Sequence, residues 1–238
     1  MTAFETYFAG LKNKKIAVLG LGVSNRPLVR LLLEHGCSVI GCDKTVREKL
    51  DEEVLELEKA GCVLSLGQTY LDGLDAELVF RTPGMHPGNP ALEQLRQKGA
   101  AVTSEMEVFF ELCPCTILAV TGSDGKTTTT TLISEMLKAA GNTVWLGGNI
   151  GTPLLQFVEQ MQPTDIAVVE LSSFQLMYFP YSAQISVVTN LAPNHLDIHN
   201  GMEEYVEAKR NVFAHQTRDG IVVLNRDNDI TNSFAPDA

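Results

Sequence analysis

A glycine-rich segment in the middle of the chain has the composition of a phosphate-binding loop. It reads Thr-Gly-Ser-Asp-Gly-Lys-Thr-Thr over residues 121–128 and stands between a strand-like run and a helix-length stretch. Backbone amides at such a place hold phosphates, while Lys126 would reach the β and γ groups and the Thr127 hydroxyl would bind Mg²⁺. Val120 stands where the strict Walker pattern has glycine, and the alternative interpretation is a chance Gly-Lys-Thr turn. The predicted ATP-binding residues are Gly122, Ser123, Asp124, Gly125, Lys126, Thr127 and Thr128.

Residues after this loop offer further ligands for magnesium. Glu170 ends the apolar run 165–169, and a carboxylate at a strand end beside a phosphate loop is well placed to hold Mg²⁺. Without the loop, Glu170 would be an ordinary exposed glutamate. The segment 195–199 alternates His, Asp and His, which fits either a metal cluster or a turn that caps the next helix. We predict a functional His195 and a solvated His199, whereas Lys209 by itself is interpreted as a surface lysine.

A second glycine turn, Gly-Leu-Gly-Val-Ser-Asn over residues 20–25, follows the first strand-like run near the amino terminus. Asp43 ends the next run about twenty residues later, where a carboxylate can accept hydrogen bonds from a ribose or base. Asn25 replaces the third glycine of the dinucleotide fingerprint, so the pattern favours a nucleotide-type ligand over NAD. A tight turn without a ligand is the alternative. Prolines and glycines also make 82–90 a loop at the carboxyl end of a strand, where parallel sheets bind ligands.

The elements that must position these residues alternate between short β-branched runs and amphipathic stretches of helix length. This alternation predicts an α/β fold with parallel sheets in two domains, divided near residues 104–114. Strands are expected at 15–19, 38–42, 62–66, 77–80, 116–120, 143–146, 166–170, 185–189 and 221–224, and helices at 25–35, 50–60 and 126–140.

Composition narrows the partners of the chain. A formal net charge of -11 argues against a nucleic-acid partner, because phosphate backbones require a basic surface. The apolar runs are too short to cross a bilayer and the first ten residues do not resemble a signal segment, so we expect a cytoplasmic protein without membrane association. The five cysteines contain no C-x-x-C pair, which favours scattered reduced thiols over a disulfide framework or zinc site.

In order and spacing, these motifs resemble the central domain of the Mur ligase family. The matching segments are the phosphate loop, 147–151, 170–175, 190–197 and 208–209. Family loops commonly have asparagine where Asp124 stands, which affects only the contact of that side chain. The Gly-Leu-Gly-x-Ser turn and the Thr-Pro-Gly segment 82–84 are similar to the first domain of the D-glutamate-adding members.

The resemblance implies a Rossmann-like domain over 1–107 that binds the UDP end of a substrate, followed by an incomplete P-loop-type central domain over 108–238. It also implies ATP and two Mg²⁺ ions as cofactors. The UDP contacts carried over are Gly22, Val23, Ser24, Asp43, Lys44, Thr82, Pro83 and Gly84, with Asn149 and Gln175 along the muramoyl portion. The catalytic residues carried over are Lys126, Glu170, His195 and Lys209, and the metal ligands are Thr127, Glu170, His195 and a Lys209 carbamylated by CO₂.

The family reaction begins when the alanyl carboxylate of UDP-N-acetylmuramoyl-L-alanine attacks the γ-phosphate of ATP. D-glutamate then displaces phosphate from the acyl phosphate. Magnesium and Lys126 are needed mainly to neutralise the two anions that meet in the first step.

The family's third domain, which binds D-glutamate, has no counterpart after residues 225–227. We therefore expect a chain that binds the UDP-substrate with little or no turnover. We also expect a monomer. One alternative is a truncated UDP-sugar protein that only binds, since it would share every motif. A nicotinamide-dependent oxidoreductase is the other, although it leaves the phosphate loop and Glu170 unexplained.

Overall fold

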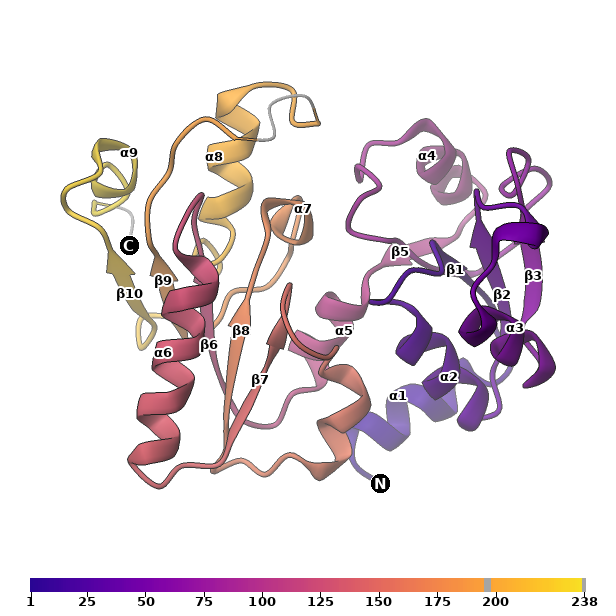
Figure 1. The fold of residues 1–238 in the computed structure, drawn as a ribbon, viewed down its shortest axis with the longest axis horizontal. Coiled ribbons are helices and arrows are strands. Elements are labelled where there is room, and N and C mark those ends of the chain that lie inside the picture. The colour runs from indigo at the N-terminus through magenta and orange to yellow at the C-terminus, as the bar shows by residue number, and fades with distance from the viewer. Residues whose placement is uncertain (195–197, 237–238) are drawn as a thin grey trace. The chain divides into compact units, whose positions relative to one another are not determined.

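The computed structural model describes residues 1–194 and 198–236, which divide into two compact units, Met1–Val108 and Phe109–Ala238. Each unit contains a five-stranded sheet in which all paired strands are parallel (Figure 1). Parallel neighbours require crossover connections, and helices supply most of them. The α/β fold class expected from the sequence is confirmed.

The sheet of the first unit has the strand order β3-β2-β1-β4-β5. Because the chain moves outward from β1 to β3 and then returns to the other side of β1, the carboxyl ends of β1 and β4 flank the switch point, where open parallel sheets bind ligands. The strands are β1 (Lys15–Leu19), β2 (Ser38–Asp43), β3 (Val63–Leu66), β4 (Leu78–Phe80) and β5 (Ala101–Thr103). The helices are α1 (Ala3–Leu11), α2 (Arg26–Glu34), η1 (Arg47–Lys49), α3 (Glu52–Lys59) and α4 (Pro90–Gln97), and α5 (Glu105–Leu112) spans the division between the units.

The core of the first unit forms around β1, whose residues after Lys15 are all buried. Strands that are covered on both faces are apolar throughout, as β1 and β4 are. Ala17 and Leu19 pack with Val79 of β4 and Leu92 of α4. The sequence did not predict α1, α4 or β5, although Asn89 marks the start of α4 by accepting a hydrogen bond from Ala91 N.

The sheet of the second unit has the order β10-β9-β6-β8-β7, with β6 at its centre. Val120 pairs with Glu170 of β8 and Thr121 with Val188 of β9, so three strands end beside the phosphate loop. The strands are β6 (Thr116–Thr121), β7 (Val144–Gly148), β8 (Ile166–Glu170), β9 (Ile185–Val188) and β10 (Ile221–Leu224). The helices are α6 (Lys126–Ala139), η2 (Leu155–Gln160), α7 (Ser173–Leu176), α8 (Met202–Arg210) and α9 (Asp229–Asn232).

Helix α6 lies along this sheet (Figure 1), because its apolar stripe packs on the strands behind the phosphate loop. Ile133 and Leu137 contact a cluster formed by Leu118, Val120 and Val168. This packing fixes the first turn of α6 directly after the loop. The loop therefore has a rigid base in the second sheet, because β6 precedes it and the packed helix α6 follows it.

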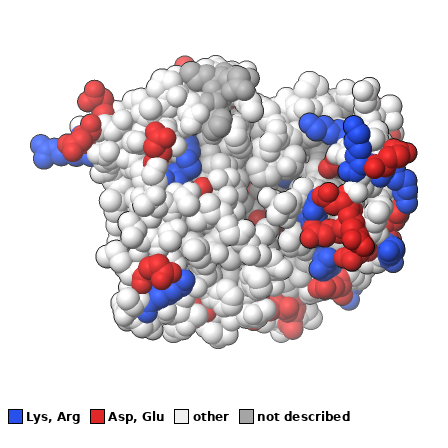
Figure 2. All heavy atoms as spheres, viewed as in Figure 1, with Lys and Arg blue, Asp and Glu red and all other residues white. Residues whose placement is uncertain are grey.

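On the side shown in Figure 2, acidic side chains lie next to basic ones over the first unit, and no large area is basic alone. Among the ion pairs of the first unit are Arg30 with Glu56 at 3.9 Å and Arg47 with Glu58 at 2.6 Å. Exposed pairs of this kind contribute little to stability. Within residues 1–194 and 198–236, no helix combines the length and apolarity needed to cross a membrane.

Candidate functional site

The phosphate loop of the second unit depends on two glycines. Gly122 and Gly125 have φ of +150° and +76°, a region in which other residues are strained. A Cβ on Gly122 would also overlap the Thr189 hydroxyl. Gly125 caps α6, so the first amides of that helix lack partners within it and face the loop. The first turn of α6 therefore has the geometry of an anion site.

Residues after β9 hold the backbone of this loop. Asn190 O accepts a hydrogen bond from Ser123 N, and its Oδ1 accepts one from Asp124 N, both at 2.8 Å. Thr189 Oγ1 donates to Asp124 O at 2.6 Å. The amides of Ser123 and Asp124 are thus bonded inside the protein, which leaves the first turn of α6 as the main source of amides for a phosphate.

Glu170 stands at the end of β8 and is only 1% exposed. Thr127 Oγ1 donates to its Oε2 at 2.7 Å, and Asn149 Nδ2 donates to its Oε1 at 2.8 Å. The close approach requires Gly148, because a Cβ there would overlap Glu170 O. The carboxylate is therefore buried and oriented by two neighbours, in contrast to the exposed glutamate of the alternative interpretation.

The Thr127 and Glu170 oxygens fit a magnesium ion, because Mg²⁺ takes oxygen ligands and keeps several waters or substrate phosphates in its shell. Over the described ranges, His, Cys, Asp and Glu side chains form no group of three or more that could hold a metal. A hydroxyl and one carboxylate are what a phosphate-dependent Mg²⁺ site requires from protein. Softer metals would need the nitrogen or sulfur ligands that this place lacks.

Lys209 on α8 is 2% exposed and points at the loop from behind. Its Nζ donates to Thr121 Oγ1 and to Gly122 O, both at 3.0 Å. Burial and, to a smaller extent, the nearby Lys126 charge lower the pKa of Lys209 to about 7, although the Glu170 carboxylate acts in the opposite direction. The interpretation of Lys209 as a surface residue is wrong, since an amine that is largely buried lies directly against the phosphate loop.

Three other predicted residues have different outcomes. Lys126 Nζ donates to Ser123 O at 2.8 Å, so its ammonium group lies over the loop. Gln175 Oε1 accepts from both the amide and the hydroxyl of Ser172 at 3.0 Å, which makes it part of a helix cap. His195 lies outside the described residues.

The prediction that His199 is solvated is wrong. It is 2% exposed, its Nε2 lies 2.9 Å from Ser173 Oγ, and its ring stacks on Phe174 with centroids 5.5 Å apart. Tyr205 meets the same ring edge-on at 5.2 Å. Its neighbours come from α7 and α8, which a local reading of segment 195–199 does not bring together.

Tyr205 is a site residue that sequence reasoning missed. Its hydroxyl lies 2.7 Å from Ser123 Oγ, and that serine hydroxyl also donates to Ala192 O at 2.9 Å. Tyr205 stands four residues before Lys209, a spacing that places both side chains on one face of a helix. This spacing could have identified Tyr205 from the sequence, because the helix face that carries Lys209 also carries Tyr205.

In the first unit, Asp43 lies directly against the first glycine turn. Leu21 N donates to its Oδ2 at 2.7 Å and Thr45 N donates to its Oδ1 at 2.8 Å. Burial raises the pKa of Asp43, but these hydrogen bonds outweigh burial and the pKa is lowered. A Cβ on Gly20 would lie 3.0 Å from Thr82 Cβ. The turn, Asp43 and the 82–84 loop thus meet at one edge of the sheet.

Asn25 shows how this turn closes without the third glycine. It is 2% exposed, and its Nδ2 donates to Leu19 O at 3.0 Å and Gly20 O at 2.9 Å. Two hydrogen bonds to the turn therefore stabilise the close contact of strand and helix. Val23, Ser24, Lys44 and Gly84 are exposed near this edge, whereas Thr82 and Pro83 are partly buried.

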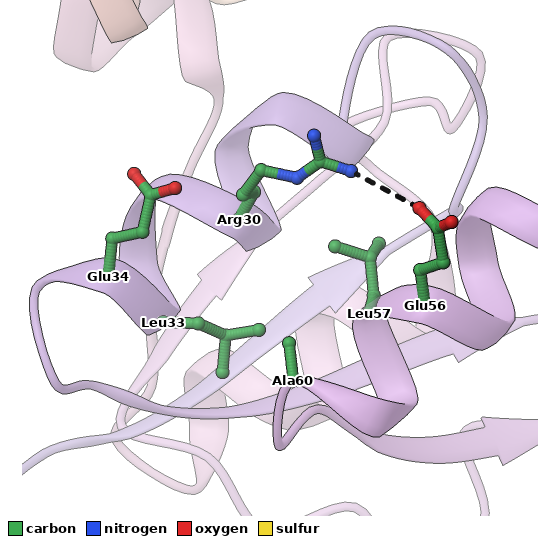
Figure 3. Close-up of a pocket in the computed structure, with 6 residues that line it drawn as sticks. All are labelled: Arg30, Leu33, Glu34, Glu56, Leu57 and Ala60. Atoms are coloured by element: carbon green, nitrogen blue, oxygen red, sulfur yellow. Dashed lines mark ion pairs between the residues drawn. The ribbon is translucent and has the colours of Figure 1, made fainter.

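A groove of about 500 Å³ lies between α2 and α3 of the first unit. Figure 3 shows apolar side chains at its floor and the Arg30–Glu56 ion pair, 3.9 Å long, at its rim. Its lining is Arg30, Leu33, Glu34, Glu56, Leu57 and Ala60. None of these is a predicted site residue, and we do not assign the candidate site to this groove.

These features define a two-unit α/β protein whose second sheet carries a loop with the sequence and geometry of a phosphate-binding loop. Residues 120–238 match the family model of the Mur ligase middle domain. The chain therefore belongs to the Mur ligase family, and the resemblance inferred from the sequence is confirmed.

Curated relatives are similar along almost the whole chain. The UDP-N-acetylmuramoylalanine–D-glutamate ligase of Clostridium botulinum (strain Loch Maree / Type A3) is 51% identical over 236 residues, 99% of this chain and 52% of that protein. The enzyme of that name from Clostridium acetobutylicum is 48% identical over 99% of this chain and 51% of its own length. The chain spans about half the length of the curated relatives it matches.

Solved structures show the same fold at low identity. A UDP-N-acetylmuramate:L-alanyl-γ-D-glutamyl-meso-diaminopimelate ligase from Neisseria meningitides is 19% identical with a TM-score of 0.63, over 94% of this chain and 75% of that one. The UDP-N-acetylmuramate-alanine ligase of Thermotoga maritima is 22% identical with a TM-score of 0.55, over 93% and 51%.

Proposed function

We propose that this chain carries the nucleotide-binding part of a ligase that joins D-glutamate to UDP-N-acetylmuramoyl-L-alanine with cleavage of ATP. The name shared by relatives 51% and 48% identical supports this reaction. The single observation that carries it is the buried contact of Thr127 with Glu170 beside the phosphate loop. We assign ATP to the second unit and the UDP end of the substrate to the first, and we propose a monomer that acts in the cytoplasm.

The chemistry of the second unit follows from four side chains, Thr127, Glu170, Asn149 and Lys126. The Thr127 hydroxyl donates its one hydrogen bond to Glu170, so the lone pairs of its oxygen remain available to a cation. Asn149 fixes the other carboxylate oxygen. Bound Mg²⁺ would neutralise phosphate charge when the substrate carboxylate attacks, and Lys126 would add a second positive charge at the loop. We propose that His195 contributes to the same centre.

We propose that CO₂ carbamylates Lys209. A neutral amine attacks CO₂ and loses one proton, which leaves a carboxylate on nitrogen as an oxygen ligand for a second Mg²⁺. The pKa of about 7 supports this, because a large share of the amine is neutral near physiological pH. A carbamate resonance from ¹³C-bicarbonate should disappear in Lys209→Gln and persist in Lys138→Gln, which changes an exposed lysine. A resonance that persists in Lys209→Gln would rule the assignment out.

In the first unit, Asp43 would recognise the uridine. Each of its oxygens accepts one backbone N–H, which leaves further acceptor capacity for a ribose or base donor. We propose that the glycine turn and the 82–84 loop surround the diphosphate and uridine. The full set of UDP contacts is Gly22, Val23, Ser24, Asp43, Lys44, Thr82, Pro83 and Gly84, with Asn149 and Gln175 proposed along the muramoyl portion.

Calorimetric titration with UDP-N-acetylmuramoyl-L-alanine tests this function, with NADH as the comparison ligand. We expect saturable binding of the UDP compound, no binding of NADH, and binding weakened roughly tenfold or more in Asp43→Ala, since a hydrogen bond to a charged group contributes about 1.5–3 kcal/mol. Asp72→Ala, which changes an exposed aspartate of the same unit, should bind as the parent does. Binding of NADH alone would contradict the proposal.

A further inference from the structure

Three sulfur atoms meet near the amino end of β6, the end of that strand opposite to the phosphate loop. Cys113 Sγ lies 3.5 Å from Cys115 Sγ and 4.0 Å from Met161 Sδ. All five cysteines are free thiols, but this pair is not scattered as the sequence predicted. The proposed ligase reaction uses none of these residues.

Ordered backbone holds each member of the cluster. Cys113 N donates to Phe109 O at 2.9 Å at the end of α5, and Cys115 immediately precedes β6. Pro114 restricts the backbone between the two cysteines. Met161 follows η2, where its amide donates to Val158 O at 3.2 Å. Because these anchors are independent, the fold itself brings the three sulfurs together.

The cluster is buried but open on one side. Cys115 and Met161 are each 4% exposed, whereas Cys113 is partly exposed and gives access from solvent. A small ion could therefore reach two thiols and a thioether without unfolding the unit.

We propose that Cys113, Cys115 and Met161 form a binding site for a soft monovalent cation, with Cu(I) as the matching ion. Thiolate and thioether ligands select soft ions such as Cu(I). With metal–sulfur bonds of about 2.3 Å, two sulfurs of a planar three-ligand shell lie roughly 4.0 Å apart. The distance from Cys113 Sγ to Met161 Sδ is 4.0 Å, and the two Sγ atoms lie somewhat closer together at 3.5 Å.

The ligand set also selects against other ions. Mg²⁺ takes oxygen ligands, so this site does not compete with the phosphate loop for magnesium. Structural zinc takes four Cys, His or carboxylate ligands, and in the part of the chain that the structure describes no three such side chains are grouped for a metal. Binding exchanges thiol protons for the cation, so affinity should rise with pH.

Competition between the chain and the chelator bathocuproine disulfonate for Cu(I) tests the site, under anaerobic reducing conditions with the full chain. We expect one ion bound per chain. Affinity should fall at least about a hundredfold in Cys113→Ser or Cys115→Ser, because even outer-shell changes at metal sites cost 10–100-fold. Met161→Leu preserves apolar volume and should weaken binding roughly tenfold by the same scale.

Matched controls and a direct view of the ligands make the test decisive. Cys62→Ser and Met177→Leu change a buried thiol and a buried thioether outside the cluster and should bind Cu(I) as the parent does. Copper K-edge absorption should show sulfur neighbours alone at about 2.3 Å. No uptake against the chelator, nitrogen or oxygen neighbours, unchanged affinity in Cys113→Ser, or a Cys113–Cys115 disulfide in place of uptake would each overturn the proposal.

Discussion

The two units place a glycine turn after the central strand of a parallel sheet, but they stabilise it differently. In the first unit, the Asn25 side chain donates hydrogen bonds to carbonyls at the start of the turn, and Asp43, on the neighbouring strand, accepts one from an amide of the turn. In the second unit, Thr189 and Asn190 hold the loop, and the ionisable groups Glu170 and Lys209 are buried behind it.

This difference supports the division of tasks that we propose for the two units. The first turn is bounded by one partly exposed carboxylate and by exposed residues such as Val23, which suits recognition of an uncharged ribose or base. The second loop faces a buried acid and a buried amine, which suits phosphate and metal chemistry. Changes at the second loop should therefore affect ATP, while changes at the first turn should affect the UDP compound.

The largest effect should come from Glu170→Gln. The amide retains the shape but removes the negative charge that Mg²⁺ requires, so magnesium-dependent ATP binding should weaken by about a hundredfold. Calorimetry with ATP and Mg²⁺ measures this, and the affinity for UDP-N-acetylmuramoyl-L-alanine should stay unchanged. Glu135→Gln, on the exposed side of α6, is the matched control. Equal losses of affinity for both ligands would contradict the assignment of ATP to the second unit and of the UDP compound to the first.

A smaller effect is expected from alanine at paired glycines. Gly122→Ala forces a Cβ into the Thr189 hydroxyl and strains the backbone, so it should destabilise the second unit by roughly 1–3 kcal/mol. Gly22→Ala, at the first turn, meets no atom within 4 Å and should change stability by less than about 0.5 kcal/mol. Urea unfolding read by the fluorescence of Trp145, the single tryptophan, measures the second unit, and amide hydrogen exchange of β1 in urea measures the first.

The opposite ordering of these two variants would contradict the geometry of both turns. Equal and small losses would show that the loop relaxes around Thr189, and the rigid base described for the second sheet would then be wrong.

Asn25→Ala should have the next effect, confined to the first unit. Two carbonyls of the turn lose their donor, which should cost roughly 1–2 kcal/mol. Amide hydrogen exchange of β1, read by mass spectrometry, measures this. Asn142→Ala removes a single hydrogen bond on the exposed surface of the second unit and should leave β1 exchange unchanged. Unchanged exchange in Asn25→Ala would mean that the turn closes without its side chain.

Much of this fold could be predicted from local patterns. The strands β1, β6 and β8 are buried after their first residue or two and largely apolar. A glycine of a predicted turn follows β1, another follows β6 after Thr121, and β8 ends at Glu170. Helix α1 was missed although Thr2 and Glu5 form a capping box, a signal that the sequence does contain. Short edge elements such as β5 carry too few residues for a period to show.

Some residues of the candidate site could likewise be found from local patterns, and others could not. Position at a strand end made Glu170 visible, whereas the burial of Lys209 depends on contacts with Thr121 and Gly122, far away in the chain. His199 was missed for the same reason, since α7 and α8 supply its neighbours. Local sequence indicates where the chain turns. The residues that bury a polar side chain come together only when the sheet and its helices have assembled.

We also expect a pH dependence of stability that follows from the buried amine. The pKa of Lys209 is lowered to about 7 in the folded chain from an ordinary value of 10.5. Between these values the unfolded chain binds more protons than the folded one, so the free energy of unfolding should rise with pH from about 7 toward 10. Lys209→Met should remove this slope, whereas Lys138→Met, an exposed change on α6, should keep it.

Asp43 supplies the contrasting case in the first unit. Its lowered pKa means that its contribution is complete above pH 3.8 and is lost as the pH falls through the folded value. Urea unfolding read by Trp145 fluorescence reports the second unit, and hydrogen exchange of β1 reports the first. A slope near neutral pH that survives Lys209→Met would assign it to another group, and the burial of Lys209 would then no longer explain how the second loop differs from the first.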